Sequence, residues 1–140
     1  MLYDGIFDNV FIHILTNDIS KIVCQENLKP NVEREEELYE FAKEFNTTIL
    51  ETASDMPDTD FFISLCLPRF DHRDHLGVLS GRDLVNNEIK KSLKHIKNIT
   101  LVSNENFSRM DFLDSDLFHL TASGFCKLMS NWTRYMPHYI

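Results

Sequence analysis

Three short apolar runs, spaced far apart along the chain, constrain the fold of this sequence most. They are VFIHIL at 10–15, FFISLCL at 61–67 and ITLV at 99–102. None alternates with charged residues, so each is predicted to be a strand that is buried on both faces. The segments between the runs are long enough to contain a helix, and connections of this kind join parallel strands. The chain is therefore predicted to form a parallel sheet covered by helices.

The segments between and after these runs have helical patterns. A run of glutamates follows Pro30, and negative charges are favourable in the first turn of a helix. The residues after it have the spacing of one apolar helical stripe: Leu38, Phe41, Ala42 and Phe45. A second stripe lies within 81–96 and comprises Val85, Ile89, Leu93 and Ile96. A third helix is expected after Thr121, burying Phe125, Leu128, Met129, Trp132 and Met136. This alternation predicts an α/β fold, a three-layer α/β/α sandwich of the flavodoxin-like type.

Composition and charge limit the possible partners and location. The chain has 14 basic and 22 acidic residues and a net charge of −8, which disfavours a nucleic-acid partner. Cys24, Cys66 and Cys126 are odd in number and have no C-x-x-C spacing, so they are expected to be reduced, mostly buried thiols of a cytoplasmic protein. The N-terminal stretch MLYDGIFDNVFIHIL carries acids and only a short apolar run, so neither a secretory signal nor a membrane partner is expected.

Polar clusters follow the predicted strands, where ligands of parallel α/β sheets bind. The sequence DSDLFHLTASGF at 114–125 places Asp116 three residues before His119 and then a helix start at Thr121. A histidine that acts as a general base needs an acceptor for its other ring nitrogen, and an aspartate on the same turn can supply it. The simpler alternative is a turn that happens to contain two polar residues.

A second cluster, Leu15-Thr16-Asn17-Asp18, directly follows the first strand. An asparagine amide there could donate to an oxyanion, or it could merely cap a turn. Together with Asp116-Leu117-Phe118-His119 and ISLCLPRFD, this cluster resembles blocks of the SGNH (GDSL-type) hydrolases, which are esterases and lipases. The resemblance implies that Asn17 is an oxyanion-hole donor, His119 the general base and Asp116 its orienting acid. It implies a small-molecule ester substrate and no metal or organic cofactor.

The sequence departs from this family in two places. The family's nucleophile is a serine on an earlier strand, and residues 1–16 contain no serine; Ser64 lies inside a predicted strand and Ser80 in a loop. Leu15 stands where the family has glycine. Residues 1–140 are therefore predicted to be a single partial SGNH-like domain that lacks the N-terminal strands and the nucleophile block and is inactive alone. The alternative is a degenerate, non-catalytic binding module.

Two further expectations concern partners and metals. Without its neighbouring strands, the segment 10–15 would be a bare apolar edge, and such an edge favours self-association.

The loop sequence FDHRDH contains Asp71, His72, Asp74 and His75, which could form a metal site. Because arginines intervene and no cysteine is near, the loop is interpreted as solvated charge, and no metal is expected.

Overall fold

The sheet is parallel, as predicted. The computed structural model describes residues 9–13, 31–68, 70, 75–117 and 119–135. Strands β1 (Asn9–His13), β2 (Asp60–Ser64) and β3 (Ile99–Val102) pair in the order β1-β2-β3, with Phe11 opposite Phe62 and Phe62 opposite Thr100. The third strand has its predicted bounds, whereas the second ends at Ser64 rather than at residue 67. Residues 14 and 15 of the first predicted strand lie outside the described residues.

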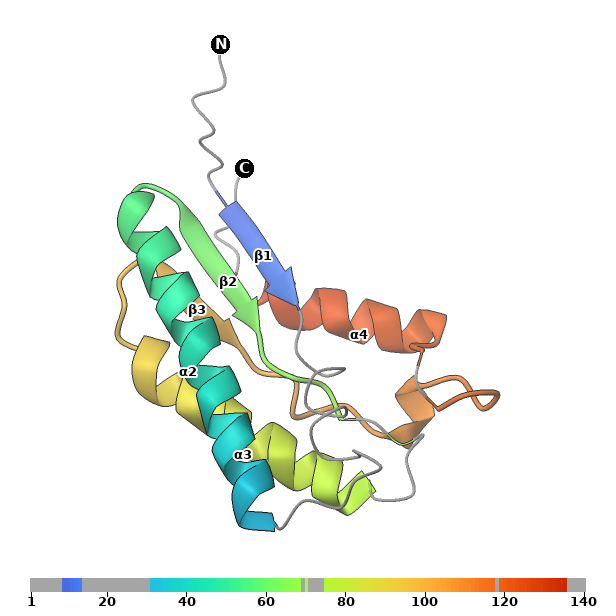
Figure 1. The fold of residues 1–140 in the computed structure, drawn as a ribbon. Helices are drawn as coiled ribbons and strands as arrows, with labels where there is room; N and C mark the ends of the chain where they lie inside the picture. Colours follow the sequence, from blue (N-terminus) through green and yellow to red (C-terminus); the bar gives the residue numbers. More distant parts are fainter. Residues whose placement is uncertain (1–8, 14–30, 69, 71–74, 118, 136–140) are drawn as a thin grey trace.

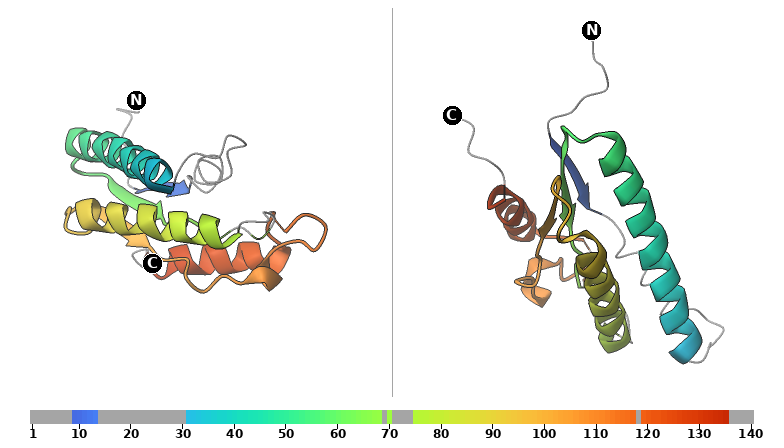
Figure 2. Two further views of the ribbon diagram at one scale, coloured as in Figure 1. Left: turned by 60° about the horizontal axis from the view of Figure 1, so that its bottom comes forward. Right: turned by 90° about the vertical axis from the view of Figure 1, so that its left-hand side faces the viewer.

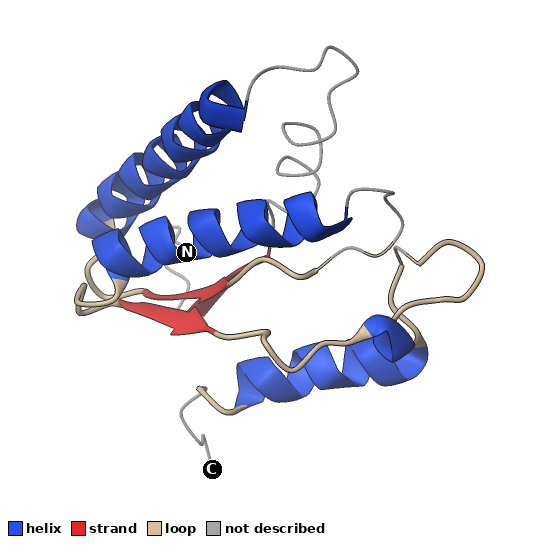
Figure 3. Ribbon diagram, turned by 90° about the horizontal axis from the view of Figure 1, so that it is seen from below, coloured by secondary structure: helices blue, strands red, loops and turns tan. Residues whose placement is uncertain are grey.

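The described helices form two layers, one on each side of the sheet. Helices α2 (Asn31–Asp55) and α3 (His75–Leu93) pack against each other on one face (Figures 1 and 2). Each connects two neighbouring parallel strands, and right-handed crossovers taken in one direction place both helices on the same face. After β3 the chain crosses to the opposite face, where α4 (Ala122–Thr133) lies (Figure 3). The architecture is the predicted three-layer α/β/α sandwich.

The main core lies between the sheet and the layer formed by α2 and α3. The predicted stripe of α2 is confirmed, because Leu38 and Ala42 are buried and Phe41 and Phe45 pack against the same cluster. The stripe of α3 is also confirmed, and the fully buried members are Val85, Ile89 and Leu93. None of the described helices is long and apolar enough to cross a membrane.

The prediction for the buried face of α4 is wrong for two of its residues. Phe125 is 55% and Met129 39% exposed, while Gly124, Leu128 and Asn131 are buried. Helix α4 is rotated about its axis relative to the predicted orientation, because Gly124 packs directly against the Asp111 backbone and Asn131 joins a buried polar network. Apolar spacing alone could not detect these two contacts, since neither residue is apolar and large.

Other sequence expectations for this layer have mixed outcomes. Trp132 packs as expected, with its ring stacked 4.9 Å from that of Phe11. Cys66 is buried as predicted, but Cys126 is exposed, because it shares the outer face of α4. Met136 and Cys24 lie outside the described residues.

Candidate active site

The loop that carries Asp116 and His119 is closed at its base. Phe112 and Leu120 form an antiparallel bridge, and the Leu113 N–H donates to the His119 carbonyl at 2.8 Å. Between the two polar residues, Leu117 adopts a left-handed conformation with φ 55°, which costs a non-glycine residue about 1 kcal/mol or more. The chain turns tightly there and returns toward α4.

The predicted helix start follows immediately, with Thr121 as the N-cap of α4. The Thr121 hydroxyl accepts a hydrogen bond from the Gly124 N–H at 2.9 Å and so satisfies a donor of the first turn of α4. The cap fixes the point at which the loop ends and the helix begins. His119 is therefore held two residues before a well-defined helix start.

The structure brings Asp116 and His119 into direct contact. His119 Nδ1 lies 2.6 Å from Asp116 Oδ2, and the His119 backbone N–H donates to Asp116 Oδ1 at 3.0 Å. An ionised carboxylate can only accept hydrogen bonds, so Nδ1 must carry the proton of this pair. In the neutral imidazole, Nε2 then carries the lone pair. This is the tautomer that a histidine needs to act as a base through Nε2.

The pair is too exposed to serve mainly as a stabilising contact. The side chains of His119 and Asp116 are 68% and 38% exposed. Ion pairs in such positions contribute about 0–1 kcal/mol to stability. Substitution of either residue should consequently leave the fold intact, which makes this pair suitable for functional tests.

The other predicted site residues are not described. Asn17 and Leu15 lie outside the described residues, and the same is true of Asp71, His72 and Asp74 of the alternative metal site. Within the part of the chain that the structure describes, no three His, Cys, Asp or Glu side chains gather in a way that could hold a metal ion.

A buried polar network near the carboxyl ends of the strands was not predicted. His13 Nδ1 lies 2.8 Å from Ser64 Oγ, and Asn104 Nδ2 donates to the same hydroxyl at 2.7 Å and to the Leu65 carbonyl at 2.6 Å. On the other side, Asn131 Nδ2 donates to Asn104 Oδ1 at 3.0 Å. The network thus connects β1, β2, the segment after β3, and α4.

This network explains why Ser64 and His13 are not a reactive pair. Ser64 is 3% exposed, so a substrate cannot reach its hydroxyl. Burial lowers the pKa of His13, which keeps its ring neutral. His13 is thus a hydrogen-bonded, half-buried histidine at the end of β1. The sequence indicates the polar network only weakly, because an asparagine two residues after a strand, such as Asn104, usually indicates only a turn.

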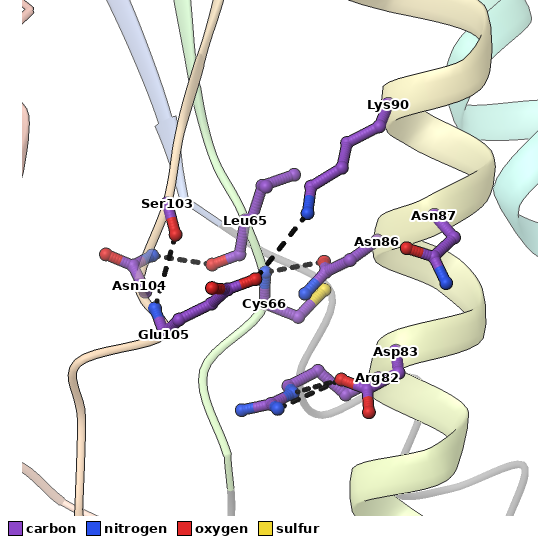
Figure 4. A pocket seen from close by; sticks show the side chains of 10 residues that line it. All are labelled: Leu65, Cys66, Arg82, Asp83, Asn86, Asn87, Lys90, Ser103, Asn104 and Glu105. Atoms are coloured by element: carbon purple, nitrogen blue, oxygen red, sulfur yellow. Dashed lines mark hydrogen bonds and ion pairs between the residues drawn. The ribbon is translucent and has the colours of Figure 1, made fainter.

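A separate cavity of about 420 Å³ lies between α3 and the segments that follow β2 and β3 (Figure 4). Its lining is mostly polar: Leu65, Cys66, Arg82, Asp83, Asn86, Asn87, Lys90, Ser103, Asn104 and Glu105. Both cations are paired, Arg82 with Asp83 at 2.9 Å and Lys90 with Glu105 at 3.6 Å. Asp116 and His119 do not line this cavity, so its size gives no information on their chemistry.

Comparison with known proteins supports the fold. The chain is similar to a solved structure named "The structure of a putative platelet activating factor from Streptococcus pneumonia", with a TM-score of 0.67 and 20% sequence identity. The match covers 96% of this chain and 62% of that chain, so this chain spans less than two thirds of the neighbour's length. No protein-family model matches the sequence, and no curated protein is significantly similar to it. At this identity the likeness establishes the α/β fold alone.

Proposed function

We propose that this α/β chain carries the acid–base part of an SGNH-type ester hydrolase. The observation that carries the proposal is the 2.6 Å contact between His119 Nδ1 and Asp116 Oδ2 on a closed loop before the last described helix. The resemblance of the two sequence blocks and the structural neighbour support it. A cytoplasmic location and a small-molecule ester substrate belong to the same proposal.

In this proposal, His119 takes a proton from a serine hydroxyl through Nε2 as the serine attacks the ester carbonyl. Asp116 stabilises the imidazolium that forms, and His119 then returns the proton to the leaving alkoxide. Water attacks the acyl-enzyme by the same route, with His119 again as the base. Asn17 donates to the oxyanion; removing one such donor from an enzyme typically costs about 3 kcal/mol. Neither metal nor organic cofactor takes part.

The serine is the component that the proposal must place elsewhere. Residues 1–16 contain no serine, Ser64 is buried, and Ser80 lies within α3 rather than in the predicted loop. Because the resemblance implies a nucleophilic serine on a strand earlier than the Asn17 block, we assign it to a segment outside residues 1–140, and we expect these residues alone to be inactive toward esters. The exposed position of His119 fits a site that is completed by further protein, since such a pair gains strength when water is excluded from it.

Turnover of a short-chain aryl ester by the longest natural form of the protein tests the proposal. Replacing His119 with alanine is expected to lower kcat by about 10³-fold or more, because the serine then has no base. His95→Ala is the matched control: it removes another exposed histidine and should leave kcat unchanged. Turnover that survives His119→Ala would contradict the proposal.

A non-catalytic module that associates through β1 is the second candidate. In the described sheet β1 is an edge strand that pairs with β2, and all five of its residues are half-buried (Figure 1). The strand has no charge, proline or glycine, the features that usually block an edge. A second copy could pair antiparallel with Phe11 opposite Phe11.

The net charge of −8 per chain opposes such pairing, so high salt should strengthen the dimer. Sedimentation velocity at low and high salt tests this candidate. A monomer under both conditions would exclude it.

A further inference from the structure

Asp111 is a buried charged residue at the base of the loop that carries the Asp116–His119 pair. It ends the short helix η1 (Arg109–Asp111), which lies beside the start of α4 (Figure 1), and is 5% exposed. Its backbone carbonyl accepts hydrogen bonds from the Thr121 N–H at 2.9 Å and from the Thr121 hydroxyl at 3.2 Å. One residue therefore connects the two ends of the loop.

The Asp111 side chain also accepts hydrogen bonds, from one residue before the loop and one residue after it. Asp111 Oδ2 accepts from the Ser108 N–H at 2.8 Å and from Lys127 Nζ at 2.8 Å. Burial alone would raise the pKa of Asp111, but the hydrogen bonds from Lys127 and Ser108 outweigh burial and lower it. The carboxylate is thus ionised and depends on Lys127 for its compensating charge.

Lys127 is oriented for this contact by its surroundings. Its ammonium also donates to the Asn106 carbonyl at 3.0 Å and lies 5.6 Å from the centroid of the Phe107 ring. Its side chain is 32% exposed, compared with 68% for that of His119. The loop is therefore held at its base by a largely buried ion pair, while the Asp116–His119 contact within the loop is exposed.

We propose that the Asp111–Lys127 ion pair is a positioning device for the His119 loop. The exposed Asp116–His119 contact is too weak to fix the loop by itself. The buried pair connects the chain before the loop, through Asp111, to the helix after it, through Lys127. Asp111 contacts the end of the loop through its backbone carbonyl, and Lys127 acts on the loop through the Asp111 carboxylate. This role rests on the proposed function in one respect, namely that the proposed function makes His119 of this loop the general base.

Amide hydrogen exchange of Lys127→Met in residues 1–140 tests the device without any need for activity. Removing one partner of a buried pair leaves an uncompensated charge. The Leu113 amide, which donates to the His119 carbonyl, is therefore expected to lose protection by about tenfold or more relative to the Leu65 amide of the core. Lys127→Arg should restore most of the protection. Lys94→Met removes the same charge from an exposed position and should change neither amide.

Unchanged protection at Leu113, or an equal loss at Leu113 and Leu65, would overturn the positioning role. Asp111→Asn provides an independent variant, which should reproduce the local loss. In a form that hydrolyses the aryl ester, Lys127→Met should lower kcat with little change in KM. A protein without ester turnover would refute the proposed function, yet the exchange result would still decide whether the ion pair holds the loop.

Discussion

Replacing Gly124 with alanine is expected to destabilise the protein by about 2 kcal/mol or more. A Cβ atom on Gly124 would lie 2.2 Å from the Asp111 carbonyl oxygen and 3.1 Å from its carbonyl carbon. These are backbone atoms, so α4 or η1 must shift, and the hydrogen bonds from Thr121 to that oxygen must weaken. The gain in helix propensity, about 1 kcal/mol, offsets only part of this cost.

The loss would appear as a lower midpoint in urea unfolding with an unchanged m-value. Ser123→Ala is the matched control, since Ser123 is the preceding, exposed residue of α4 and its substitution should change stability by less than about 0.5 kcal/mol. A Gly124→Ala variant as stable as the natural protein would show that α4 does not approach Asp111 this closely.

Replacing Asn104 with alanine is expected to cost about 3 kcal/mol. Asn104 is 3% exposed, and its amide donates to Ser64 Oγ and the Leu65 carbonyl while its oxygen accepts from Asn131. Truncation removes these three hydrogen bonds and leaves buried partners without them. An unsatisfied buried polar group costs about 1–3 kcal/mol of stability. The loss of stability in Asn104→Ala should therefore exceed the loss caused by an ordinary surface substitution.

Thermal and urea unfolding of Asn104→Ala would measure this loss, with Asn87→Ala on the exposed side of α3 as the control. Asn131→Ala removes the other end of the same contact. The double variant should therefore lose less than the sum of the two single variants. Additive losses would show that the two asparagines do not act as one network.

Sequence patterns predicted the fold well where burial depends on apolar side chains. The runs at 61–67 and 99–102 gave two strands, and the stripes containing Leu38 and Val85 gave the two helices that cover one face. The pattern failed at α4 because Gly124 and Asn131, rather than Phe125 and Met129, face the interior. Close backbone contact and polar networks determine that orientation, and neither produces an apolar period.

Part of the candidate site was also accessible from sequence. The three-residue spacing of Asp116 and His119 on a turn predicted that the two side chains could meet, and the helix start at Thr121 is confirmed. Their role in catalysis stays a prediction, as does that of Asn17. The Asp111–Lys127 ion pair could not be predicted, because its partners are 16 residues apart and only the packing of η1 on α4 brings them together.

The protonation of the two ring nitrogens of His119 tests most directly the claim that Asp116 prepares this histidine to act as a base. Nitrogen NMR of residues 1–140, at a pH where the imidazole is neutral, distinguishes the two tautomers. We predict a proton on Nδ1 and none on Nε2, with the preference lost in Asp116→Asn while the fold is retained. A neutral ring protonated at Nε2, or a tautomer unaffected by Asp116→Asn, would contradict the account.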